Sequence, residues 1–140
     1  LVAQDTVVVR SSPMNVQQTV PLLLVRDIEK SRDFYCGGLG FKSENEWAPE
    51  ASLAWCWLGH GSAALMLQQQ CEGDPPPATW GKGMTLYFIC DDAAAAFQEF
   101  CERGVDASEP AEAFYGMVQT FVTDSDGYKL CFENPVGFGK

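Results

Sequence analysis

The chain has 140 residues, enough for one compact domain or for one internally duplicated domain. Nineteen acidic residues against nine basic ones give a formal net charge of −10, which argues against nucleic acid or an anionic membrane as a partner because both need a basic surface. No window approaches the roughly 18 consecutive apolar residues of a membrane-spanning helix, so none is predicted.

The first elements of the chain are predicted from an apolar run and the residues that follow it. Residues 1–15 are interpreted as an N-terminal extension without a structural role. The apolar run at residues 20–25 is typical of a strand in a sheet with little solvent on either face. Asp27 can accept hydrogen bonds from the free amides of a following helix turn, and Gly40 supplies a left-handed residue near the helix end. A strand, a helix and a second strand are therefore expected here.

The same order of elements returns 64 residues later. The segment "VPLLLVRDIEKSRDFYCGGLGF" (20–41) aligns with "MTLYFICDDAAAAFQEFCERGV" (84–105) at this constant offset. Asp27 then falls on Asp91, which is expected to cap a second helix in the same way, and Gly40 falls on Gly104. Such internal similarity predicts two copies of one supersecondary unit.

Further strands complete each copy. "FKSENEW", "SLAWCWLG" and "SAALMLQQQ" read as three strands in the first half, and "MVQTFVTD" and "YKLCFEN" as two in the second, with a weak strand near Val105. We therefore predict an α+β fold of two tandem βαβββ modules, at residues 16–72 and 83–135. Residues 73–82, rich in Pro and Gly, form the predicted linker, and residues 136–140 a C-terminal tail.

The six cysteines show no C-x-x-C spacing, and most lie in apolar runs where a thiol behaves as a small hydrophobic group. We interpret them as free thiols in a reducing environment. The N-terminal residues also lack the pattern of a signal peptide. A cytoplasmic location is therefore expected.

Two segments, together with the duplication, resemble a known family. "VRDIEKSRDFYCGGLGF" is similar to the strand, Asp, helix, Phe-Tyr and Leu-Gly-Phe pattern of the vicinal oxygen chelate superfamily, and "DSDGYKLCFENP" is similar to its D-P-D-G strand. That superfamily includes glyoxalase I, extradiol dioxygenases, fosfomycin-resistance enzymes and bleomycin-resistance proteins. The resemblance implies that the two modules form a curved mixed sheet around a cleft, often completed by a second subunit.

The metal ligands of that superfamily, typically His, Glu or Gln, do not carry over. The resemblance assigns their positions to Val20, Met66, Met84 and Cys131. Divalent cations of this family need N and O donors, so we expect no metal and no cofactor. A shift of two residues would bring in only Gln18, Gln68 and Glu133 as donors. Cys131 either lines an apolar cleft or is a small core residue.

The aromatic residues are the better candidates for ligand contacts, because Trp and Tyr offer flat faces for stacking on planar or cationic groups. Trp55 and Trp57 share one face of a strand, either toward the ligand or beneath the helices. Trp47 and Tyr115 are expected at the ligand mouth. The predicted ligand-binding set is Trp47, Trp55, Trp57, Met66, Met84, Tyr115 and Cys131. His60, the sole histidine, is interpreted as an exposed turn residue.

The leading hypothesis is a metal-free homodimer, similar to the bleomycin-resistance group, that sequesters an aromatic or cationic small molecule without catalysis. A second hypothesis is a lyase or dioxygenase-like enzyme with an unusual or absent metal site, in which Cys131, His60 or Glu133 does the chemistry. A third is a structural or regulatory dimer without a small ligand. The identity of the ligand stays open.

Overall fold

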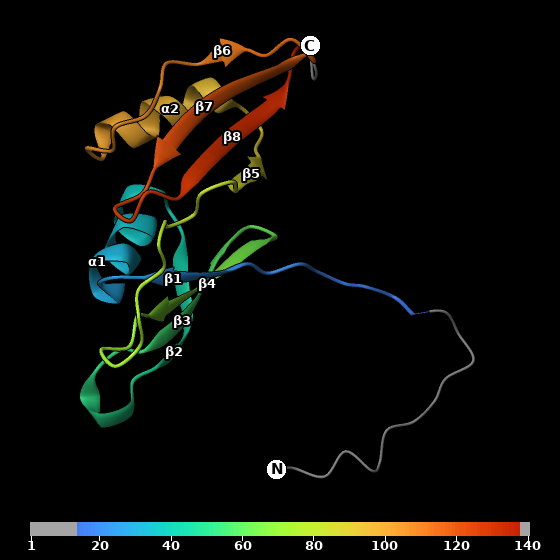
Figure 1. Cartoon of the computed structure of the whole chain (residues 1–140). Helices are drawn as coiled ribbons and strands as arrows, with labels where there is room; N and C mark the ends of the chain where they lie inside the picture. Colours follow the sequence, from blue (N-terminus) through green and yellow to red (C-terminus); the bar gives the residue numbers. More distant parts are fainter. Residues whose placement is uncertain (1–13, 138–140) are drawn as a thin grey trace.

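The computed structural model describes residues 14–137, which form two modules of similar build (Figure 1). The first module contains β1 (Leu22–Val25), α1 (Ile28–Asp33), the π-helical segment η1 (Phe34–Gly38), β2 (Lys42–Trp47), the short 3₁₀ segment η2 (Pro49–Ala51), β3 (Trp55–His60) and β4 (Ala63–Gln69). The second contains β5 (Thr85–Ile89), α2 (Ala93–Glu102), β6 (Ala111–Glu112), β7 (Met117–Thr123) and β8 (Lys129–Pro135). Most of the extension predicted at residues 1–15 and of the tail at 136–140 lies outside the described residues.

Each module has its own four-stranded mixed sheet. The strand orders are β1-β4-β3-β2 and β5-β8-β7-β6, and in each sheet the first pair is parallel and the others are antiparallel. The predicted α+β fold of two tandem βαβββ modules is therefore confirmed. The weak strand expected near Val105 is wrong in position: the short strand is β6, and Ala107 forms only an isolated bridge with Val122.

Equivalent polar residues begin the two helices. Asp27 Oδ1 accepts a hydrogen bond from the Lys30 amide at 3.2 Å, and Asp92 Oδ1 accepts one from the Ala95 amide at 3.1 Å. The expectation that Asp91 caps the second helix is therefore wrong. An amide side chain from the last strand of each module supports the same helix start, because Gln69 accepts from the Ile28 amide and Asn134 from the Ala93 amide.

Equivalent residues of the two modules are accordingly 65 positions apart, not 64, in β1 and β5, in β4 and β8, and at the helix starts. Gly40 and Gly104, both at positive φ, keep the offset of 64. The first helix absorbs the difference, since it continues into η1 (Phe34–Gly38), and a π-helical segment accommodates one extra residue in a helix. A single inserted residue thus displaces the register predicted for β5.

The helices lie on the same side of the molecule, and each covers one face of its sheet (Figure 1). Leu23, Leu65 and Leu67 are fully buried in the first module, and Leu130 and Val122 are buried in the second. The two cores are continuous, because the Phe41 ring of the first module lies 5.6 Å from the Phe88 ring of the second. Burial of these side chains on one sheet face leaves the other face of each sheet without a helical cover.

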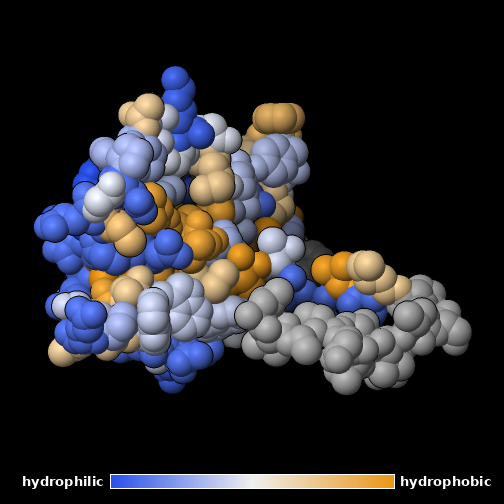
Figure 2. All heavy atoms as spheres, turned by 60° about the horizontal axis from the view of Figure 1, so that its bottom comes forward, coloured by the Kyte–Doolittle hydropathy of each residue, from blue (hydrophilic) through white to orange (hydrophobic). Residues whose placement is uncertain are grey.

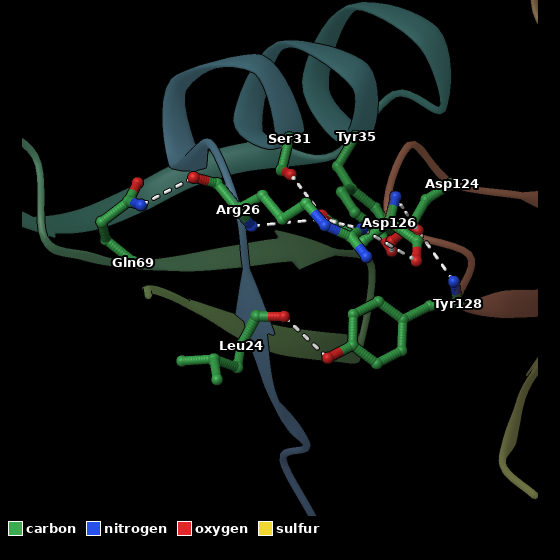
Figure 3. A network of polar contacts seen from close by, with 8 residues as sticks. All are labelled: Leu24, Arg26, Ser31, Tyr35, Gln69, Asp124, Asp126 and Tyr128. Atoms are coloured by element: carbon green, nitrogen blue, oxygen red, sulfur yellow. Dashed lines mark hydrogen bonds and ion pairs between the residues drawn. The ribbon is translucent and has the colours of Figure 1, made fainter. Parts of the chain in front are cut away.

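A polar network joins the modules at the turn between β7 and β8 (Figure 3). The Arg26 guanidinium and backbone amide both donate to Asp126 Oδ1, at 3.0 and 3.1 Å, and the Ser31 hydroxyl donates to Oδ2 at 3.2 Å. The Tyr35 hydroxyl donates to Asp124 Oδ2 at 2.6 Å. Both carboxylates are buried, so this turn is a structural connection between the modules.

The linker also contributes to this junction. Arg26 lies 4.1 Å from the centre of the Trp80 ring, in a cation–π contact. Trp80 therefore packs at the module junction. No helix in the described part of the chain has the length and apolar character needed to cross a membrane.

Candidate functional site

The face of each sheet that is turned away from the helices carries the candidate site residues. We call the face on β1–β4 the first open face and the face on β5–β8 the second open face. Their members follow from the burial pattern: Cys56 and Leu58 are fully buried on the helix side, so Trp55 and Trp57 point to the opposite side. The prediction that these two tryptophans share a face is confirmed, and their alternative placement beneath the helices is wrong.

The first open face is built around three tryptophans. Trp47 lies directly opposite Trp55 in the pairing of β2 with β3, and Trp57 lies opposite Met66 in the pairing of β3 with β4. Trp47 is 60% exposed, whereas Trp55 and Trp57 are half-buried. The sequence thus forms a contiguous aromatic surface with Met66 at its floor.

The second open face carries Cys131 at its centre. Cys131 lies opposite Tyr87 on one side and opposite Phe121 on the other. Tyr87 and Phe121 are exposed, while Cys131 is fully buried beneath them. Burial is the main cause that raises the pKa of the Cys131 thiol to about 12. The thiol is therefore neutral at physiological pH and is not activated as a nucleophile.

Next to Cys131 lies a polar cluster formed by Glu133, Gln119 and Tyr115. Glu133 Oε1 accepts hydrogen bonds from Gln119 Nε2 at 2.9 Å and from the Tyr115 hydroxyl at 3.3 Å. Gln119 Nε2 also donates to the Tyr115 oxygen at 2.6 Å. Desolvation and the neighbouring Glu133 carboxylate raise the pKa of Tyr115, with a further contribution from Tyr87. The cluster combines a carboxylate, an amide and a phenol.

The structure divides the predicted ligand-binding set between two surfaces. Trp47, Trp55, Trp57 and Met66 come together on the first open face, and Tyr115 and Cys131 on the second. Met84 lies one residue before β5 and is exposed. Within residues 14–137 no strand of one sheet pairs with a strand of the other, so one chain does not close these surfaces into a single cleft.

The four positions of the expected metal site do not fit a divalent cation. With the corrected offset of 65, the counterpart of Val20 is Thr85 and not Met84, while Met66 and Cys131 keep their equivalence. A valine, a thioether, a hydroxyl and a neutral buried thiol do not supply the N and O donors that such cations need. No group of three or more His, Cys, Asp or Glu side chains within residues 14–137 is arranged to hold a metal ion.

His60 ends β3, is exposed, and packs edge-on against Phe41 with 5.3 Å between the ring centres. It lines a cavity of about 450 Å³ between the modules, together with residues such as Phe88 and Glu99. None of the seven predicted ligand-binding residues lines this cavity, whose walls include the core residues Leu39, Phe41 and Phe100. His60 therefore has no acid–base partner on either open face.

Sequence reasoning missed Tyr87, Gln119 and Phe121. The signal for all three was available in principle, since residues directly opposite Cys131 and Glu133 in the neighbouring strands share their face. It needed the strand register. The one-residue insertion in the first helix obscured the register of β5, and the turn between β7 and β8 determines that of Gln119 and Phe121. The alternation of "MVQTFVT" then places Gln119 and Phe121 together.

Comparisons with known proteins agree with this architecture. Residues 16–132 match the family model described as Glyoxalase/Bleomycin resistance protein/Dioxygenase superfamily. The chain belongs to this superfamily. The resemblance inferred from the sequence is thereby confirmed. No curated protein sequence gives a significant match.

Three solved structures show how widely the fold is shared. TioX from Micromonospora sp. ML1 superposes with a TM-score of 0.68 at 17% identity, covering 86% of this chain and 100% of its own. A bleomycin-binding protein complexed with bleomycin gives 0.66 at 23% identity, covering 85% and 98%. TnmS3, an antibiotic binding protein from Streptomyces sp. CB03234, gives 0.64 at 24% identity, covering 87% and 99%. At these identities the similarity establishes the fold, and the superfamily fits a small-molecule-binding role.

Proposed function

We propose that this protein binds an aromatic small molecule on its open sheet faces without a metal, and that it acts by sequestering this ligand. The observation that carries the proposal is the contiguous surface of Trp47, Trp55 and Trp57 on the first open face. Flat aromatic side chains at a solvent-facing sheet surface stack well on planar ligands. A binder of this kind lowers the concentration of free ligand and needs no reactive group.

Two further observations support binding over catalysis. The Cys131 thiol is buried and neutral, and His60 lies away from both open faces. The superfamily members with comparable folds include a bleomycin-binding protein and an antibiotic binding protein, which supports an antibiotic-like ligand here. No observation favours a lyase or dioxygenase reaction at this site.

We also propose that the protein is a homodimer in which the open faces of two copies form the cleft. Large apolar side chains are exposed on both faces, among them Leu22, Trp47, Tyr87, Ile89 and Phe121. Figure 2 shows that hydrophobic residues also reach the surface on the side that it presents, bordered by hydrophilic ones. Exposed apolar patches of this kind are typical of association surfaces. Sedimentation at micromolar concentration tests this part, and a monomer would contradict it.

Binding is tested by tryptophan fluorescence of protein pretreated with a chelator. A panel of aromatic antibiotics that includes bleomycin is titrated in, and at least one compound is expected to quench saturably without added metal. Metal analysis of untreated protein is the companion measurement. One tightly held divalent ion per subunit, or quenching only after metal is restored, would contradict the metal-free proposal.

A further inference from the structure

The Glu133 carboxylate is unusual for its position on a sheet face that is otherwise aromatic and apolar. It is only 7% exposed, although Tyr87 and Ile89 on the neighbouring strand are exposed. Ile89 lies directly opposite Glu133 in the pairing of β5 with β8. A carboxylate held among apolar side chains carries a desolvation cost unless hydrogen bonds or a positive charge offset it.

No positive charge within the described part of the chain offsets it. None of the ion pairs formed by residues 14–137 involves Glu133. The one basic residue on the same face of β8 is Lys129, four residues along the strand, and at the strand rise of about 3.3 Å per residue the two side chains start roughly 13 Å apart. Among residues 14–137, therefore, no basic side chain pairs with the charge of Glu133.

The hydrogen bonds of Glu133 all reach one of its two oxygens. Gln119 Nε2 and the Tyr115 hydroxyl both donate to Oε1, at 2.9 and 3.3 Å, and no donor of the described residues reaches Oε2. No fully buried side-chain oxygen or nitrogen in this part of the structure lacks a partner. Oε2 therefore retains some contact with solvent and accepts no hydrogen bond from the described residues, so its lone pairs are available for a ligand donor.

Two phenol side chains lie on the same face as this carboxylate. Tyr115 is 51% exposed and its hydroxyl donates to Oε1, and Tyr87, also exposed, lies opposite Cys131 on the neighbouring strand. A carboxylate oxygen next to aromatic rings attracts a cation through two interactions. One is a charge-assisted hydrogen bond, and the other is the electrostatic attraction of the ring quadrupoles. A neutral donor receives only the weaker hydrogen bond, and an anion is repelled.

We infer that Glu133, oriented by Gln119 and Tyr115, recognises a protonated nitrogen of the ligand, so that the ligand class is an aromatic compound with an ammonium, amidinium or guanidinium group. This inference rests on the proposed small-molecule function and adds its charge selectivity. The nitrogen docks on Glu133 Oε2 on the second open face, and the attached ring system lies against the neighbouring phenol rings. The excess of acidic residues over basic ones favours the approach of such a cation.

The experiment compares two probes that share a ring system, 9-aminoacridine, which is protonated at pH 8, and acridine, which is neutral there. Isothermal titration of the full-length protein is expected to show preference for 9-aminoacridine of about tenfold, as for one partly desolvated charge contact. The substitution Glu133→Gln should reduce this preference to less than about threefold while the affinity for acridine changes less than twofold. Raising the salt should weaken the preference only in part, because a poorly exposed charge is less screened.

Glu112→Gln is the matched control, since it removes one negative charge from the same sheet. Glu112 is exposed and pairs with Val118, which places it on the helix side of the sheet. It should keep the full preference. Tyr115→Phe, which retains the ring and removes one donor to Oε1, should change the affinity for 9-aminoacridine less than Glu133→Gln does. Thermal unfolding of each variant establishes that it is folded.

The outcomes separate this inference from the proposed function. Equal binding of both probes by the unmodified protein, or a preference that survives Glu133→Gln, would overturn the role of Glu133 and leave small-molecule binding intact. A loss of preference in Glu112→Gln as large as in Glu133→Gln would reduce the effect to net charge and would also overturn it. Failure of both acridines to bind would contradict the proposed aromatic site and the inference together.

Discussion

The two modules share a framework and differ at the surfaces it leaves open. Asp27 and Asp92 cap equivalent helices, and Gln69 and Asn134 support the same helix starts from equivalent strands. On the open faces, equivalent positions hold different chemistry. Gln68 of the first module corresponds to Glu133 of the second, since each lies two residues beyond the central Met66 or Cys131.

The cross-strand neighbours of Gln68 and Glu133 also differ in their chemistry. Gln68 lies opposite Trp55, whereas Glu133 lies opposite Gln119. At this position one face is thus aromatic with an amide, and the other presents a carboxylate held by an amide. Capping and core positions are constrained by the fold in both modules, whereas the open faces are free to diverge, which is where a ligand-specific surface would arise.

The largest expected difference in stability between the modules concerns the turns that join the last two strands of each sheet. The β7–β8 turn carries Asp126, which is buried and binds Arg26 and Ser31, while the β3–β4 turn at Ser62 is exposed. Asp126→Ala should lower the free energy of unfolding by about 2–4 kcal/mol, because it leaves the buried serine hydroxyl and a backbone amide unpaired. Chemical denaturation measures this. Ser62→Ala should stay within about 0.5 kcal/mol, and equal losses in both variants would contradict a structural role specific to the β7–β8 turn.

The open faces are compared by truncating one aromatic residue on each. Trp47→Ala and Tyr115→Ala should each weaken binding of 9-aminoacridine by roughly 1–2 kcal/mol, the range of a partly desolvated aromatic or cation–π contact. Neither side chain belongs to the core beneath the helices, so thermal stability should change little. Titration calorimetry measures the affinity.

Trp80→Ala is the control for these truncations, because Trp80 packs on Arg26 at the module junction and away from both faces. It should leave the affinity unchanged to within about twofold. If Trp47→Ala and Tyr115→Ala bind like the unmodified protein, the ligand is not placed on these faces even though the fold is as described.

The helix starts test the corrected register of the repeat. Asp92→Ala should cost about 1 kcal/mol of stability because it removes the cap hydrogen bond to the Ala95 amide, whereas Asp91→Ala should be nearly neutral. Urea unfolding of both variants is sufficient. A larger loss of stability in Asp91→Ala than in Asp92→Ala would support the offset of 64 that the aligned sequence suggests.

This register shows what could be predicted from the sequence and what could not. The apolar runs, capping residues and glycines were sufficient to predict two βαβββ modules, because each signal is local. The extra residue accommodated by η1 (Phe34–Gly38) cannot be detected from composition. The sequence therefore indicates Asp91 instead of Asp92 as the helix cap, and Met84 instead of Thr85 as the counterpart of Val20. Backbone accommodation of one residue is a property of the folded helix.

The candidate site could also be predicted from the sequence only in part. Strand alternation places Trp55 and Trp57 on one face, but both sides of that strand are apolar, so only the packing of Cys56 and Leu58 beneath the helices decides which face is open. The cluster of Glu133 with Gln119 needs the pairing of β7 with β8, which the turn after Thr123 determines. Cross-strand neighbours of this kind are tertiary information.

The smallest expected effect is a pH dependence of stability that arises from Asp124 in the β7–β8 turn. Burial raises the pKa of Asp124 above its ordinary value, and the nearby Asp126 carboxylate acts in the same direction, while hydrogen bonds from Tyr35 and from the backbone amide of Tyr128 oppose the rise. For a carboxyl group whose pKa is higher in the folded state, folding is favoured by protonation. Its contribution to stability is then fully present below the unfolded pKa of about 3.9 and is lost as the pH rises through the folded value.

The substitution Asp124→Asn isolates this contribution. Asn does not titrate, and it retains one acceptor oxygen where Asp124 uses two, Oδ2 for the Tyr35 hydroxyl at 2.6 Å and Oδ1 for the backbone amides of Asp126 and Tyr128. The lost acceptor changes stability at every pH, so only the pH dependence of the difference reports the titration. The difference in free energy of unfolding between the unmodified protein and the variant should therefore shift against the unmodified protein as the pH is raised from the ordinary carboxyl range toward neutrality. Urea denaturation at a series of pH values measures it. A difference that shifts in favour of the unmodified protein over this range would mean that the hydrogen bonds at the β7–β8 turn outweigh burial, and that Asp124 stabilises the module junction as a charged acceptor.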